Sequence, residues 1–167
     1  MIEVRVEDLA FYSGNAIIRP ATATLGATTP LLRRLELAGG PTLLDKLRVS
    51  EPLPVGSAVV TAAGGLPVEL LVHAIVSSPT EGVSRDGVRR AFRSALERAR
   101  DWQLADVAVP PLGLGAGNLE LEVSAEVMAD ELVRHIRMSS FPKNVTLVAE
   151  TADEASALEH AIARSAD

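Results

Sequence analysis

The fold is decided by the stretch from Gly56 to Val76, which reads GSAVVTAAGGLPVELLVHAIV. Two apolar runs, Gly56–Ala62 and Val68–Val76, flank a Gly-Gly-Leu-Pro turn, a pattern typical of neighbouring strands. The second run is apolar on both faces at all but two positions. Because a strand of this kind is covered by other elements on each side, the stretch predicts a central sheet with helices on both faces.

Strands and helices alternate over the rest of the chain. Periodic apolar residues predict helices within 84–102, 121–136 and 151–164, with Ser84 and a Thr151–Glu154 capping box at two of the starts. Gly39-Gly40-Pro41 divides the region 30–47 into two short helices. This order predicts an α/β fold of three layers, α/β/α, with a mixed central sheet in a single domain over residues 1–167. The remaining strands are expected at Ile2–Val6, Asn15–Ile18, Asp106–Val109 and Asn144–Ala149.

Composition excludes several classes of protein. The chain has no cysteine, so it has no disulfide, thiol nucleophile or thiolate metal site, and no two of its three histidines stand at HxxxH spacing. The net charge of −6 argues against a nonspecific nucleic-acid binder. No apolar run is long enough for a membrane span, and the charged N-terminal residues are unlike a signal peptide. We therefore expect a cytoplasmic protein that uses no metal or cofactor and binds neither nucleic acid nor membrane.

One loop has the composition of an anion-binding site. After the strand Asp106–Val109, residues 110–118 read PPLGLGAGN and lead into a helix. Glycines at alternate positions allow positive φ and leave backbone N–H groups open to a phosphate or pyrophosphate. The loop lacks the Lys-Ser/Thr of a P-loop and the glycine spacing of a Rossmann fingerprint. The alternative is a plain structural connection in which Glu120 and Glu122 satisfy the helix N-terminus.

The same loop, its preceding strand and the segment from Gly56 to Ala74 together resemble the macro domain family. The segment is similar to a family pattern of the form G-x-A-x-x-T-x-G-x-L-P-x-x-x-x-I-H-A, and the resemblance covers nearly the whole chain. It implies a mixed sheet between helices and a cleft that binds ADP-ribose or a related nucleotide.

The resemblance also implies a set of ligand contacts. It places Asp8 where the family has an aspartate that hydrogen-bonds the adenine amino group, with Leu9 beside it; the alternative for Asp8 is an exposed turn acid. Thr22 and the pair Gly26-Ala27 fall on the loop that faces the distal ribose. The pyrophosphate is expected on the backbone of the glycine-rich loop, at Leu112, Gly113, Leu114, Gly115, Ala116 and Gly117.

Several positions depart from the family pattern. Arg19 and Thr22 stand where the family usually has asparagines, and Thr22 replaces the one that contacts the distal ribose. Leu114 replaces a common threonine, and the aromatic residue that often stacks on adenine after the last strand is absent. Each substitution removes a specific contact, so efficient turnover is less expected than binding.

No catalytic residue is predicted. His73 is interpreted as a hydrogen-bonded core group rather than an acid or base, and His135 and His160 are expected at the surface. No two carboxylates stand at a spacing that would split their pKa values.

Three functions fit the sequence. The first is a module that binds ADP-ribose, free or attached to a protein. The second is a macro-like scaffold that has lost its ligand and serves as a structural or interaction domain. The third is a weak hydrolase or deacylase of ADP-ribose derivatives, which would need few protein groups if the substrate orients its own water. The sequence leaves the partner protein and the oligomeric state open.

Overall fold

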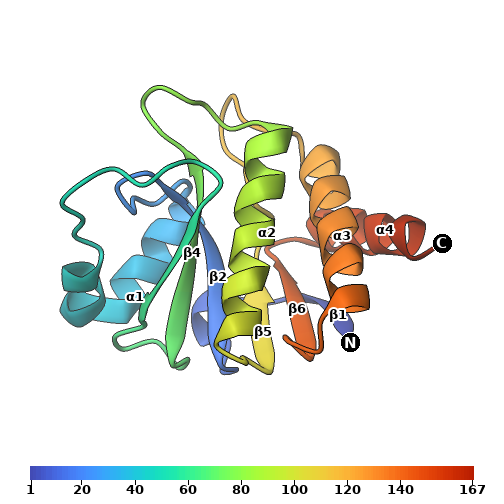
Figure 1. The fold of residues 1–167 in the computed structure, drawn as a ribbon, viewed down its shortest axis with the longest axis horizontal. Coiled ribbons are helices and arrows are strands. Elements are labelled where there is room, and N and C mark those ends of the chain that lie inside the picture. Colours follow the sequence, from blue (N-terminus) through green and yellow to red (C-terminus); the bar gives the residue numbers. More distant parts are fainter.

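A computed structural model describes residues 1–167 as a six-stranded sheet between two layers of helices (Figure 1). The strand order is β1-β6-β5-β2-β4-β3; all neighbours are parallel except β3, which is antiparallel to β4. The strands are β1 (Ile2–Val6), β2 (Ala16–Thr22), β3 (Ala58–Ala62), β4 (Leu70–Ser77), β5 (Asp106–Val109) and β6 (Asn144–Ala149). The helices are a short 3-10 helix η1 (Leu9–Phe11), α1 (Pro30–Lys46), α2 (Arg85–Asp101), α3 (Leu121–Met138) and α4 (Ala152–Ala166). The mixed sheet and the α/β/α layering confirm the expected fold.

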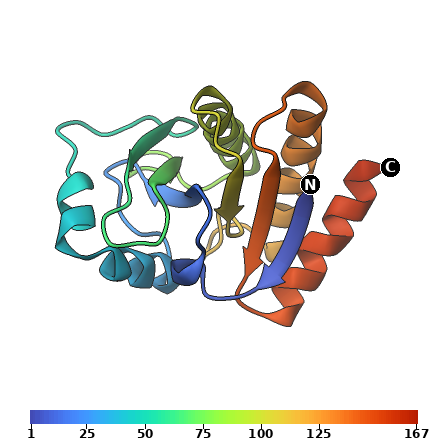
Figure 2. The ribbon, with the colours of Figure 1, turned by 90° about the horizontal axis from the view of Figure 1, so that it is seen from below.

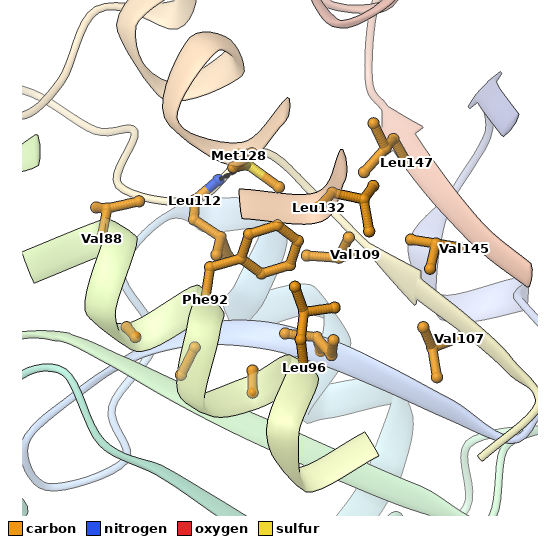
Figure 3. Packing of buried hydrophobic residues seen from close by; sticks show 14 of the residues in the cluster. Val88, Phe92, Leu96, Val107, Val109, Leu112, Met128, Leu132, Val145 and Leu147 are labelled. Carbon is orange, nitrogen blue, oxygen red and sulfur yellow. Dashed lines mark hydrogen bonds between the residues drawn. The ribbon is translucent and has the colours of Figure 1, made fainter. Parts of the chain in front are cut away.

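The larger core lies between one face of the sheet and α2, α3 and α4. It is almost entirely aliphatic, and Phe92 is its single aromatic member. Figure 3 shows the Phe92 ring directed from α2 toward Leu112, Val109 and Leu132. The alternate residues of each strand point to the other face.

A smaller core on that other face contains Ile17, Leu71 and Ala108 and packs against α1 and η1. Figure 2 shows α1 on this face, below β2 and β4, whereas β1 and β6 are left without a helix there. Helix α1 bends where Gly40 adopts a non-helical conformation (φ 73°), which confirms the break expected at Gly39-Gly40-Pro41.

Side-chain caps fix the starts of three helices. Thr29, Ser84 and Thr151 accept hydrogen bonds from the first-turn amides of α1, α2 and α4, and Glu154 reaches back to the amide of Glu150. The cap expected at Thr151 is therefore confirmed, although Glu154 accepts from the residue before Thr151 and not from Thr151 itself. Helix α3 differs, because its N-cap residue Glu120 makes no side-chain cap hydrogen bond.

Two local expectations are wrong, and one further element was not predicted. The second strand does not end at Ile18 but continues to Thr22, because its later residues pair with β4. The 3-10 turn η1 has no periodic apolar signal and was not expected. His135 is buried rather than exposed, because the stretch after α3 folds back over it and the carbonyl of Phe141 bonds its ring at Nε2.

Strands β2 and β5 separate toward their carboxyl ends. These neighbouring strands pair only at Ala16 and Ile17, so the rest of β2 is paired on one side, and Pro20, which has no backbone N–H, lies in that stretch. The chain leaves β2 toward α1 on one face and leaves β5 toward α3 on the other. In α/β sheets ligands bind at such switch points, outside the carboxyl ends of the strands.

Among the helices, none combines the length and apolar character that a bilayer crossing requires.

Candidate ligand-binding site

Two loops follow the diverging ends of β2 and β5, and they come close to each other. We call residues 23–29, between β2 and α1, the first loop, and residues 110–120, between β5 and α3, the second loop. A Cβ added at Gly115 of the second loop would lie 3.5 Å from the carbonyl oxygen of Thr28 in the first loop. The fold thus brings together two segments that are far apart in the sequence and that both carry predicted ligand contacts.

The second loop presents unpaired backbone donors. The N–H groups of Gly113, Leu114, Gly115, Ala116 and Gly117 make no hydrogen bond within the protein. The loop is closed by other groups, because Asn118 N donates to Gly115 O and Leu119 N donates to Gly113 O, both at 3.0 Å. Residues 115–118 are exposed. The loop is therefore held in shape without using the amides that an anion would need.

Two glycines of this loop are required for different reasons. Gly115 has φ 134°, a backbone conformation that side chains with a Cβ rarely adopt. At Gly113 (φ 82°), a Cβ would lie only 2.7 Å from Cγ2 of Val88, so this glycine allows the loop to pack on α2. The alternate glycines therefore serve both the shape of the loop and its seat on the core.

The first loop is a tight turn with further free amides. Thr22 N donates to Gly26 O, and Gly26 N donates to Thr22 Oγ1 at 2.9 Å, which closes the turn. The hydroxyl of Thr22 and the amide of Gly26 therefore bond each other. The amides of Ala27 and Thr28 make no hydrogen bond within the protein, and Thr28 Oγ1 is buried without a partner.

The electrostatic surroundings of the first loop favour a negative ligand. The positive ends of the α1 and α3 dipoles both lie at this edge of the sheet; α1 has no acidic residue in its first turn, whereas α3 has Glu122 there. A hollow on the first-loop side is lined by Ala27, Thr28, Thr29, Pro30 and Arg33. An anion can therefore be attracted here although the chain as a whole is acidic.

Asp8 lies at the other end of the same edge. Its exposed carboxylate caps η1 by accepting a hydrogen bond from Ala10 N through Oδ1. The chain next to it is attached to the end of β6, because Glu7 N donates to Ala149 O. The following residue, Glu150, forms an ion pair with Arg34 of α1 at 3.5 Å. One carboxylate oxygen of Asp8, Oδ2, makes no hydrogen bond within the protein.

Two of the predicted contact residues face the core. The side chains of Leu9 and Leu112 have no exposed surface. Both backbone groups of Leu112 are also occupied, by Met128 Sδ at its N–H and by Ser124 Oγ at its carbonyl. These residues pack beneath the two loops, and the unpaired amides of the second loop begin at Gly113, which is itself buried; exposure begins at Gly115.

Sequence reasoning missed a buried polar network behind the first loop. Arg19 is fully buried, and its guanidinium donates to His73 Nδ1 at 2.8 Å, to Glu36 Oε1 at 3.0 Å and to the carbonyl of Leu25 at 2.7 Å. Because Nδ1 of His73 accepts, its Nε2 carries the proton and donates to Thr61 Oγ1 at 2.8 Å. Arg19, which stands where the family usually has an asparagine, therefore points into the core. This network also shows His73 to be a hydrogen-bonded core group, as expected.

The network makes stability depend on pH. Burial, and then the charge of Arg19, hold the pKa of His73 well below its ordinary value of 6.5. Below pH 6.5 the unfolded chain takes up a proton that the folded chain does not. The free energy of unfolding should therefore be fully present above pH 6.5 and should fall as the pH drops from there, by up to about 1.4 kcal/mol per pH unit. Urea titrations between pH 7 and 5.5 measure this slope; a slope that is unchanged in a folded His73→Asn variant would contradict the assignment.

Another hollow lies away from the two loops. It covers the bare face of β1 and β6 and includes none of the predicted contact residues. Its lining holds Glu3, Glu7 and Asp106 against the single side-chain cation Arg5, so it does not suit an anion. The structure also contains no group of three or more His, Asp or Glu side chains placed to hold a metal ion.

Comparisons with known proteins agree on one family. Residues 29–128 match the family described as Macro domain. An uncharacterized protein of Aquifex aeolicus is 34% identical over 71% of this chain and 72% of its own, and a macro domain-containing protein of Methanosarcina mazei is 23% identical over 98% and 92%. Among solved structures, a mutant Oceanobacillus iheyensis macrodomain with ADPR gives a TM-score of 0.87 at 19% identity, covering 98% of this chain and 92% of that one. The Trypanosoma brucei macrodomain in complex with ADP-ribose gives 0.86 at 17%, covering 96% and 68%. At these identities the two structures establish a shared fold.

Proposed function

Because the chain belongs to the macro domain family, we propose that it binds ADP-ribose or a related ADP-ribosyl nucleotide at the carboxyl ends of β2 and β5, where these strands separate. The observation that carries this proposal is the row of unpaired amides from Gly113 to Gly117, which supplies donors for a pyrophosphate. The two neighbours of known structure that are described with ADPR or ADP-ribose support the choice of ligand.

In this proposal each end of the nucleotide has its own contacts. The pyrophosphate lies on the second loop, near the positive end of α1 and beside the free amides of Ala27 and Thr28. The free carboxylate oxygen of Asp8 accepts from the adenine amino group. The distal ribose faces the first loop. ADP-ribose attached to a protein would bind at the same ends of β2 and β5.

Binding is favoured over a scaffold that has lost its ligand. The second loop keeps glycines in positive-φ conformations and leaves five successive amides without partners within the protein, whereas a loop that serves only as a connection needs neither feature. Catalysis has less support, because the Thr22 hydroxyl is already used to close the first loop.

Thermal unfolding tests the proposal. A ligand that binds only the folded chain stabilises it by about 2.7 kcal/mol at 100 times its Kd, so excess ADP-ribose should raise the melting temperature. AMP at the same concentration should give a smaller shift, because it lacks the pyrophosphate bridge. Differential scanning calorimetry with each nucleotide measures both values. If ADP-ribose produces no shift even at millimolar concentration, the scaffold function is the correct one.

A further inference from the structure

We propose that Arg19 is a positioning residue that holds the first loop in the conformation needed for the distal part of the nucleotide, an inference that rests on the function proposed above. Arg19 does not reach the proposed nucleotide site itself, because it is fully buried between β2, β4 and α1. It acts through the carbonyl of Leu25, which accepts from Nη2 at 2.7 Å.

The guanidinium is fixed in orientation before it contacts the loop. His73 Nδ1 accepts from Nε, and Glu36 Oε1 accepts from Nη1, so two bonds from different elements set its plane. Glu36 also compensates the charge, because the pair is 3.0 Å apart and both side chains are almost completely buried. The remaining amino group, Nη2, then donates to the carbonyl of Leu25 in the first loop. Its donors form a rigid planar fork, a geometry that lysine lacks.

Leu25 adopts a conformation that needs such support. Its φ is 64°, in the left-handed region that is unfavourable for a residue with a side chain. The side chain is buried in a small cluster with Ala21, Ala23, Val55 and Ile75. The conformation is therefore held from two sides, by apolar packing of the side chain and by the Arg19 bond to the carbonyl.

The position of Leu25 determines where the ligand-facing part of the loop lies. Gly26 and Ala27 follow directly, and the carbonyl of Thr28 lies against Gly115 of the second loop. The second loop keeps its own shape through the bonds from Asn118 N and Leu119 N. Loss of the Arg19 bond should therefore displace the first loop and leave the second loop in place.

Affinities for ADP-ribose and ADP separate these effects, because ADP keeps the pyrophosphate and lacks the second ribose. We expect Arg19→Lys to weaken ADP-ribose about tenfold and ADP by less than about twofold, measured by isothermal titration calorimetry on the full chain. A merely structural role would weaken both nucleotides equally or neither. Leu104→Ala is the control: it removes buried packing at the opposite edge of the sheet, so it lowers the melting temperature without changing the ratio of the two affinities.

A second variant keeps the test valid if Arg19→Lys does not fold. The double variant Arg19→Gln with Glu36→Gln removes both charges together, so no buried charge is left unpaired. It should show the same loss of preference for ADP-ribose over ADP, whereas Glu36→Gln alone keeps the guanidinium and should keep the preference. An unchanged preference in the Arg19 variants overturns the proposal. Failure of the unaltered protein to bind ADP-ribose would overturn the proposed function, and with it this inference.

Discussion

A Gly115→Glu variant is expected to lose ADP-ribose binding completely while remaining folded. In the unaltered protein, excess nucleotide should raise the melting temperature, and in the variant that shift should disappear. Titration calorimetry should likewise give no measurable heat of binding.

Two physical effects act together at this position. The backbone at Gly115 has φ 134°, so any side chain strains the second loop and should change the positions of its amides. The new carboxylate also places a negative charge beside amides that are proposed to hold a doubly charged linkage. The loop is exposed, so the substitution should have little effect on the packing of the core.

A control variant isolates the position from the charge. Ala163→Glu introduces the same carboxylate at an exposed site near the end of α4, away from both loops, and should retain the full shift. If Gly115→Glu keeps the shift as well, the second loop has no part in binding.

Phe92→Ala is expected to cause the largest loss of stability from a single core substitution. Phe92 is fully buried and lies between α2, α3 and the sheet (Figure 3), where the other side chains are aliphatic. Removal of its ring leaves a cavity that rigid β-branched and Leu neighbours fill only in part. The free energy of unfolding should fall by about 3–5 kcal/mol, and the melting temperature by roughly 6–20 °C.

The same substitution at an exposed phenylalanine provides the comparison. Phe11 is 79% exposed, so Phe11→Ala should change the free energy of unfolding by less than about 0.5 kcal/mol. Equal losses in the two variants, measured by urea denaturation, would show that the core does not depend on the ring.

Local patterns predicted most of the architecture because each element carries its own signal. The apolar run Val68–Val76 indicated a central strand, and β4 is buried along nearly its whole length. Gly39-Gly40-Pro41 indicated the bend of α1, and Thr151 with Glu154 indicated the start of α4. These features depend on residues that are close in the sequence, so periodicity and capping are sufficient to find them.

Features that depend on distant partners could not be found in this way. The end of β2 is set by pairing with β4, more than fifty residues later in the chain. Arg19 was noted only as a replacement for a family asparagine, because its partners, Glu36 and His73, have no sequence relation to it. One signal was present: a charged residue followed by Pro20 inside an otherwise apolar stretch suggests an internal partner. The ligand contacts assigned to the two loops and to Asp8 stay predictions.

The placement of the aromatic residues limits which optical signals can follow this protein. Trp102, the single tryptophan, ends α2 at the edge opposite the two loops and is already 56% exposed in the folded chain. Its fluorescence emission should therefore change little when a nucleotide binds at the two loops, and only modestly when the chain unfolds. A tryptophan introduced beside the first loop would be needed before quenching could report on occupancy.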